Sequence, residues 1–327
     1  MKLSGIARFL VRAGIVPLLT IFSFGQTQAS STAAEKTVLD ASVPAAATFQ
    51  IKVNEVDLSF TARDRHNHWV TNLSASDISV LDNGQPPKAI LSFQSRADLP
   101  LRVGLVIDTS DSVTRQFEAE RQSAIFFIQQ VLNPSTDSAF VIAFNGKAKL
   151  VQGLTSDVTA LSSAIRNLPL GGHTALYDAV HYACKKLKES GDGPTVRRVL
   201  ILLTDGDDNS SYFQMPEVID AALQANVVII ALNTNIEPNP LDPKYKEFQQ
   251  MAEISGGLIL RADTEKRVAK AFKEIQEQLR SHYFLVYKPA ELNQDGSYRR
   301  IRLKARRRGL HIFYRHGYYA PAAAQKK

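Results

Sequence analysis

Residues 101–112 read LRVGLVIDTSDS, an apolar run that ends in a cluster of carboxyl and hydroxyl side chains. Residues 103–107 are apolar on both faces, which is typical of a strand inside a parallel sheet that helices cover on both sides. Residues 199–203 repeat this pattern and are followed by Thr204 and Asp205. We therefore expect a doubly wound, mostly parallel α/β sheet, in which functional side chains gather at the carboxyl ends of strands.

Apolar periodicity on both sides of this stretch predicts an alternation of strands and helices. Candidate strands occupy residues 101–108, 138–144, 149–152, 199–205, 227–233 and 258–262. Candidate helices occupy residues 113–132, 158–168, 175–189, 216–225, 245–254 and 265–281. The alternation predicts one α/β domain at residues 96–281.

Short alternating runs on either side of this domain predict β-structure. Before it, candidate strands occupy residues 53–62, 69–73, 78–81 and 89–93, with a turn at Asn83-Gly84. After it, they occupy residues 282–287, 299–305 and 310–314, with a turn at residues 294–296. Because these last strands cannot form a stable domain by themselves, we expect an accessory antiparallel β-sandwich built from an N-terminal segment, 47–95, and a C-terminal segment, 282–321. A tail at 322–327 follows.

The first 29 residues have the pattern of a secretory signal peptide. Lys2, Arg8 and Arg12 precede an apolar run at residues 15–24, and small residues follow before Ser30. A transmembrane anchor is the alternative, but crossing a bilayer takes about 20 apolar residues and this run is shorter. We expect a signal peptide at 1–29, a linker rich in Ala, Ser and Thr at 30–46, and export to the periplasm, the cell surface or the extracellular space.

The composition is that of a globular protein, with 44% hydrophobic and 22% charged residues and a formal net charge of +7. This excludes disordered and multi-span membrane chains. Cations concentrate at residues 299–308, but Ile301 and Leu303 alternate with Arg300 and Arg302, which indicates the solvated face of a strand rather than a nucleic-acid site. The single cysteine, Cys184, lies on an apolar helical stripe, and we interpret it as a buried, unreactive thiol.

Five oxygen-bearing side chains fall at strand ends or helix starts of the predicted sheet. They are Asp108, Ser110, Ser112, Thr174 and Asp205. Two carboxylates and three hydroxyls are hard ligands, which suit Mg²⁺, or Mn²⁺ or Ca²⁺, better than zinc or copper. Because only two ligands are charged, the cation remains electron-poor and an open coordination position is the functional feature.

Asp108-Thr109-Ser110-Asp111-Ser112 resembles the D-x-S-x-S motif of the metal-ion-dependent adhesion site (MIDAS) in von Willebrand factor A domains, which have a Rossmann-like fold. Thr174 and Asp205 match its later elements. Residues 172–179, 204–209, 81–84 and 315–321 are similar to an exported bacterial VWFA-related family of acidobacterial type, over about residues 49–321. The resemblance implies a non-enzymatic adhesion module with no catalytic residues, in which an Asp or Glu of a protein partner completes the coordination of the metal. It names no partner and leaves association with the cell envelope and the oligomeric state open.

One departure from the family pattern and two other functions remain to be weighed. His173 stands where relatives carry a small residue; it could influence the cation, but we expect it to face solvent.

A phosphatase-like, metal-dependent hydrolase is suggested by Asp205, Asp207 and Asp208 in one loop, yet we find no nucleophile, Lys or Arg near the motif. We interpret Asp207 and Asp208 as capping or solvating that loop. A structural envelope scaffold with a non-essential metal is the third reading.

Overall fold

The computed structural model describes residues 55–322 except 96–98, 116, 192–195 and 237. These residues belong to one compact unit. The expected signal peptide and linker lie outside the described residues. Within the described part of the chain, no helix is long and apolar enough to span a bilayer.

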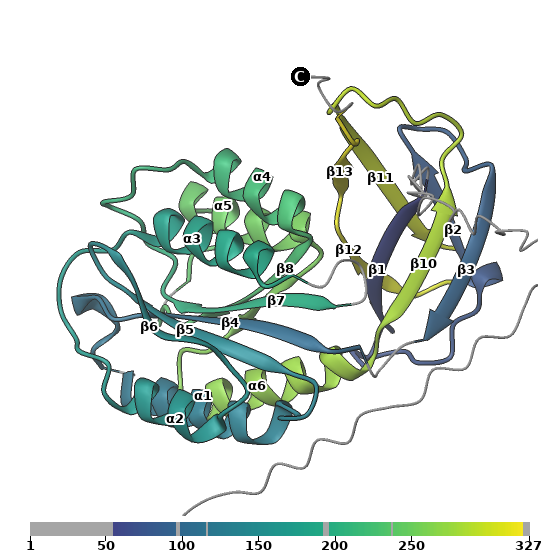
Figure 1. The fold of residues 1–327 in the computed structure, drawn as a ribbon. Coiled ribbons are helices and arrows are strands. Elements are labelled where there is room, and N and C mark those ends of the chain that lie inside the picture. Colours follow the sequence, from purple (N-terminus) through teal and green to yellow (C-terminus); the bar gives the residue numbers. More distant parts are fainter. Residues whose placement is uncertain (1–54, 96–98, 116, 192–195, 237, 323–327) are drawn as a thin grey trace, which may run out of the picture. The chain divides into compact units, whose positions relative to one another are not determined.

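A six-stranded sheet forms the centre of the α/β domain (Figure 1), in the order β6-β5-β4-β7-β8-β9. Its strands are β4 (Leu101–Asp108), β5 (Ser138–Phe144), β6 (Ala148–Thr155), β7 (Arg197–Thr204), β8 (Val227–Asn233) and β9 (Leu258–Arg261). All neighbours pair in parallel except β6, which turns back on β5 as an antiparallel edge strand. The expected mostly parallel α/β sheet is thereby confirmed.

Helices cover both faces of this sheet (Figure 1). They are α1 (Phe117–Val131), α2 (Val158–Arg166), α3 (Leu176–Glu189), α4 (Met215–Ala225), α5 (Pro243–Ser255) and α6 (Glu265–Arg280). One apolar core joins α1, α2 and α6 to the sheet, and a second joins α3, α4 and α5 to its other face. Successive residues of β4, such as Leu105 and Val106, therefore point into different cores.

The strands outside the α/β domain form two antiparallel sheets, in the orders β12-β1-β10-β3 and β13-β11-β2. They are β1 (Val56–Arg63), β2 (Ile78–Asp82), β3 (Ala89–Ser95), β10 (Tyr283–Lys288), β11 (Tyr298–Ala305), β12 (His311–Tyr314) and β13 (Gly317–Tyr319). β1 pairs with β10 and β2 with β11, so strands that precede the α/β domain in the sequence pair with strands that follow it. A shared core holds Phe60, Ile78, Tyr283 and Ile301. The accessory β-sandwich from N- and C-terminal segments is confirmed.

The strand expected at residues 69–73 is wrong. Only Trp69 forms an isolated β-bridge, with Arg63. The amide of Val70 still donates to Ala62, but the amide of Leu73 donates instead to the hydroxyl of Tyr283, at 2.9 Å. A side-chain hydroxyl from β10 thus takes the place of a strand partner, which periodicity along the chain does not reveal.

The cationic run near the C-terminus behaves as expected with one exception. Along β11, Arg300 and Arg302 are exposed while Ile301 and Leu303 are buried, as on the solvated face of a strand. Arg299 differs because it is buried and forms a 2.6 Å ion pair with Asp82. Cys184 is fully buried, and burial raises the pKa of its thiol to about 12, in agreement with an unreactive role.

Candidate metal centre

The predicted ligands lie at the carboxyl end of the central sheet. Asp108 is the last residue of β4, and Asp205 directly follows the last residue of β7. These two strands are neighbours, with Ile107 paired to Leu203. Parallel pairing therefore brings the two carboxylate-bearing segments together, although 96 residues separate Asp108 from the neighbouring Thr204.

Asp108 is fully buried and its carboxylate is held on both sides. Its Oδ1 accepts the backbone N–H of Ser110 at 2.9 Å, and its Oδ2 accepts the hydroxyl of Thr204 at 2.7 Å. Burial raises the pKa of Asp108 to about 6, against these hydrogen bonds, and the negative charge of Asp205 adds to the rise. Thr204 is thus an orienting residue that sequence reasoning missed.

The two serines of the motif face each other. Their Oγ atoms lie 3.0 Å apart, because a short 3-10 helix at Asp111–Val113 tightens the loop after Ser110. This turn replaces the start of the helix that periodicity predicts at residue 113, and α1 begins only at Phe117. The hydroxyls of Ser110 and Ser112 are thereby brought together, and the amide of Ser110 is bound to the buried Asp108.

Thr174 is buried, and its loop is held by hydrogen bonds to two segments, the one that follows β4 and the one that follows β7. Gly171 donates to the carbonyl of Thr109 at 2.8 Å, and Asp111 donates to that of Gly172 at 3.2 Å. On the other side, the amide of Thr174 donates to Oδ1 of Asn209 at 2.9 Å. Gly171 and Gly172 both have positive φ angles, 121° and 107°, which a side chain would strain. Hydrogen bonds to the segment after Asp108 and to the segment after Asp205 therefore fix the position of the loop between Leu168 and Leu176.

Asp208 caps the helix that follows Thr174. Its Oδ1 accepts a hydrogen bond from the amide of Leu176, the first residue of α3, at 2.8 Å. The negative carboxylate also interacts favourably with the partial positive charge at the N-terminus of the helix. Asp207 is exposed, with Oδ1 3.5 Å from Nζ of Lys244. Both roles confirm the interpretation that these aspartates cap or solvate the loop. His173 is exposed to solvent, as expected.

A cavity of about 270 Å³ opens beside the ligands. Its lining is contributed by the motif, by the β7 loop and by the segment after β8: Ser112, Val113, Arg115, Asp205, Asp207, Thr234, Asn235 and Ile236. Ser112 and Asp205 therefore share one opening to solvent. The expectation of no Lys or Arg near the motif is wrong, because Arg115 lies on this rim.

Glu120 is a second group that sequence reasoning missed. It is fully buried on α1, and burial, with the charges of Asp108 and Asp205, raises the pKa of its carboxyl to about 8. A signal was present in the sequence: Glu120 lies three residues after Phe117 and four before Ala124, on the buried stripe of the helix. A carboxylate at such a position is rare in a core.

The donor set fits a hard divalent cation. Two carboxylates and neutral hydroxyls at one end of the sheet are the ligands that Mg²⁺ and Ca²⁺ take. Within the described part of the chain, no three His, Cys, Asp or Glu side chains come together as a metal-binding group. A site here depends on serine and threonine hydroxyls as well as on Asp108 and Asp205.

A family model described as the von Willebrand factor type A domain matches residues 103–278, more than half of the 327 residues. The chain belongs to the von Willebrand factor type A (VWA) domain family. The match contains all five predicted ligands. VWA domains are generally interaction modules, often dependent on a divalent cation.

Solved structures similar to this VWA chain are distant. A von Willebrand factor type A protein from Catenulispora acidiphila is 14% identical, with a TM-score of 0.46, covering 85% of this chain and 76% of that one. The PilB minor pilin from Streptococcus sanguinis is 14% identical, with a TM-score of 0.46, covering 61% of this chain and 63% of the pilin. The chain thus spans less than two thirds of the pilin's length. Proximal thread matrix protein 1 from the mussel byssus, with a zinc-occupied MIDAS motif, is 16% identical, with a TM-score of 0.47, covering 61% of this chain and 50% of that one. No curated protein sequence matches.

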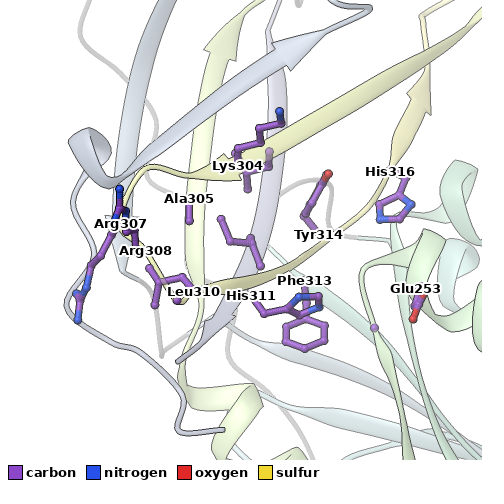
Figure 2. Close-up of a pocket in the computed structure, with 14 residues that line it drawn as sticks. Glu253, Lys304, Ala305, Arg307, Arg308, Leu310, His311, Phe313, Tyr314 and His316 are labelled. Atoms are coloured by element: carbon purple, nitrogen blue, oxygen red, sulfur yellow. The ribbon is translucent and has the colours of Figure 1, made fainter. Parts of the chain in front are cut away.

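A larger cavity, of about 530 Å³, is lined by none of the predicted ligands of the VWA domain. Figure 2 shows the residues that line it. Lys304, Arg307, Arg308 and His311 from β11, β12 and their turn line it, and Glu253 is its acidic residue. A predominantly cationic lining repels a divalent cation. The smaller cavity beside Ser112 and Asp205 is therefore the candidate metal centre.

Proposed function

We propose that this protein is a metal-dependent protein-binding module of the adhesion type. Asp108, Ser110, Ser112, Thr174 and Asp205 hold one divalent cation, Mg²⁺ or else Mn²⁺ or Ca²⁺, and an Asp or Glu of a protein partner completes its coordination. The observation that carries this proposal is the meeting of the paired serine hydroxyls, 3.0 Å apart, with the ends of β4 and β7 at an open cavity.

The charge balance of the site supports an acidic partner. Asp108 already accepts two hydrogen bonds, which disperse its negative charge, and the serine and threonine ligands are neutral. A divalent cation in this setting retains affinity for a further anionic oxygen. Arg115, exposed on the rim, adds a positive charge that attracts a carboxylate approaching the opening.

A metal-dependent hydrolase remains the alternative from another functional class. The rim Arg115 supplies one element of phosphoryl chemistry, a cation that binds the transferred group. The described lining offers the hydroxyls of Ser112 and Thr234 but no general base to activate one of them, since Asp205 is assigned to the metal and Asp207 is exposed, next to Lys244. Binding therefore accounts for the site with fewer assumptions. A scaffold role with a non-essential metal is the third possibility that the experiment below tests.

Export belongs to the same proposal. The leader pattern at residues 1–29 supports a location in the periplasm, at the cell surface or outside the cell, where a partner in the cell envelope is accessible. The alternation of exposed cations with buried Ile301 and Leu303 along β11 argues against a nucleic-acid partner. We propose a protein as the ligand.

The test combines metal titration with partner capture. The purified protein, from residue 30 onward, is titrated with Mn²⁺ by calorimetry, and then immobilised and exposed to a cell-envelope extract in Mg²⁺ or in EDTA. Asp205→Ala removes a ligand, while Glu189→Ala changes an exposed carboxylate that pairs with Lys186 and does not line the cavity. We expect wild type and Glu189→Ala to bind Mn²⁺ and to capture the same partner only in Mg²⁺, and Asp205→Ala to do neither.

Two outcomes would replace this proposal. Capture that persists in EDTA and in Asp205→Ala would establish the scaffold reading. Hydrolysis of a phosphoester or peptide that is lost in Asp108→Ala would establish the hydrolase.

A further inference from the structure

Glu120 is a buried carboxylate that the proposed ligand set does not use. It lies on α1 between Phe117 and Ala124, whose side chains face the core, and it is as fully buried as they are. An apolar residue would fill this position at no electrostatic cost. A buried ionisable group at such a place needs a compensating partner.

The surroundings of Glu120 provide no such partner among the described residues. Neither of its oxygens has a hydrogen-bonding partner, and the buried hydroxyl of Thr234 is unpartnered too. Thr234 lies close enough to favour the charged form of Glu120 slightly, without closing a hydrogen bond. The charges that act on Glu120 are those of Asp108 and Asp205, and both are negative.

In their charged forms these three carboxylates repel one another in a low-dielectric region, which disfavours the charged form of Glu120 in the metal-free protein. Thr234 lines the candidate metal cavity together with Asp205, and Glu120, which interacts with Thr234, is not part of this lining. A divalent cation between Asp108 and Asp205 would turn this repulsion into attraction, because charge interactions remain strong over several ångströms inside a protein. The buried site is thus organised around a positive charge.

We propose that Glu120 is a positioning residue of the cation site, a third carboxylate whose negative charge helps to hold the divalent ion from behind Asp108 and Asp205. This inference rests on the proposed metal dependence. Glu120 acts from beyond ligand distance, since no three acidic side chains of the described chain gather as a metal-binding group. The ion therefore gains affinity without losing the coordination position that the partner's carboxylate fills.

The experiment measures Mn²⁺ affinity and thermal stability of Glu120→Gln, which keeps the shape of the side chain and removes its charge. Outer carboxylates of metal sites typically contribute about 10- to 100-fold to affinity, and we expect the dissociation constant for Mn²⁺ to rise by about tenfold. At neutral pH the melting temperature of the metal-free variant should equal or exceed that of wild type, because folding of the wild type forces Glu120 to take up a proton that the unfolded chain releases, a cost that glutamine does not have.

Two control variants separate the possible failures. Glu118→Gln changes an exposed carboxylate on the same helix, which pairs with Arg121, and should bind Mn²⁺ like wild type. Asp108→Ala should lose Mn²⁺ binding. If Glu120→Gln binds Mn²⁺ as tightly as wild type while Asp108→Ala does not, the role of Glu120 is refuted and the proposed function stands.

Other results also decide the matter. A metal-free Glu120→Gln that melts below wild type would show that the carboxylate stabilises the fold itself, and this would overturn the inference. Absence of Mn²⁺ binding in wild type would overturn both the inference and the proposed function.

Discussion

The hydroxyl of Thr204 donates a 2.7 Å hydrogen bond to Oδ2 of Asp108, joining the last residues of two neighbouring parallel strands. Both residues are fully buried. Since the amide of Ser110 engages Oδ1, Thr204 fixes the remaining orientation of the carboxylate. The site at the end of the sheet is therefore held in place by the fold before any ligand arrives.

Replacing Thr204 by Val should weaken the site while keeping its shape. The substitution leaves Oδ2 of Asp108 buried without its donor, which costs about 1–3 kcal/mol of stability. The freed carboxylate should reduce Mn²⁺ affinity by about tenfold, as loss of an outer hydrogen bond does in other metal sites. Calorimetric titration measures the affinity and urea unfolding the stability. Thr204→Ser keeps the hydroxyl and should restore both; equal behaviour of the Val and Ser variants would contradict the role of this hydrogen bond.

The parts of the fold and site that sequence reasoning predicts are those encoded locally. The apolar runs that became β4 and β7 are buried on both faces, so their pattern alone identified a covered parallel sheet. Asp108 ends β4 and Ser110 and Ser112 follow within one turn, so their proximity follows from chain connectivity. Strand pairing then brings Asp205 beside them, because the carboxyl ends of parallel strands share one edge.

The parts that were missed depend on tertiary contacts. The hydrogen bond from Thr204 to Asp108 and the electrostatic coupling of Glu120 to both aspartates arise only after the sheet and α1 have packed. The segment after Trp69 reads as a strand but is held by the hydroxyl of Tyr283, which lies more than 200 residues away in sequence. The burial of Arg299 on β11 likewise requires the counter-charge of Asp82 on β2, which precedes the α/β domain in the sequence. Periodicity reports which face is apolar and cannot report which distant polar group will meet it.

Asp208 and Asp207 are adjacent carboxylates with different expected contributions. Asp208→Ala removes the acceptor for the amide of Leu176 and for the hydroxyl of Ser211, and loss of a helix cap costs about 1 kcal/mol. The loop carrying Thr174 ends at this cap, so Mn²⁺ affinity should also fall. Asp207→Ala removes an exposed carboxylate and should change stability by less than about 1 kcal/mol. Thermal unfolding of both variants measures the difference, and equal losses would contradict the assigned cap.

The accessory sandwich contains a buried polar network that should be essential to its stability. Asp82 accepts Arg299 at 2.6 Å and the hydroxyls of Tyr287 and Tyr318 at 2.9 and 2.8 Å. Asp82→Ala leaves a buried guanidinium without its counter-charge, and breaking such a pair costs about 3–5 kcal/mol. Urea unfolding should detect this loss, whereas Arg300→Ala, on the exposed face of β11, should be nearly neutral. A cost below about 1 kcal/mol for Asp82→Ala would show that the network contributes little.

The metal-free protein should lose stability with rising pH because of Glu120. The pKa of this carboxyl is raised from 4.5 to about 8, so between these values the unfolded chain releases a proton that the folded protein retains. Stability therefore falls as pH rises through this window and levels off above it. Glu120→Gln lacks this dependence because the amide does not titrate. The variant should match wild type near pH 4.5 and exceed it by a few kcal/mol near pH 8, in urea unfolding with EDTA present. A difference that stays constant across this range would show that Glu120 has an ordinary pKa in the folded protein.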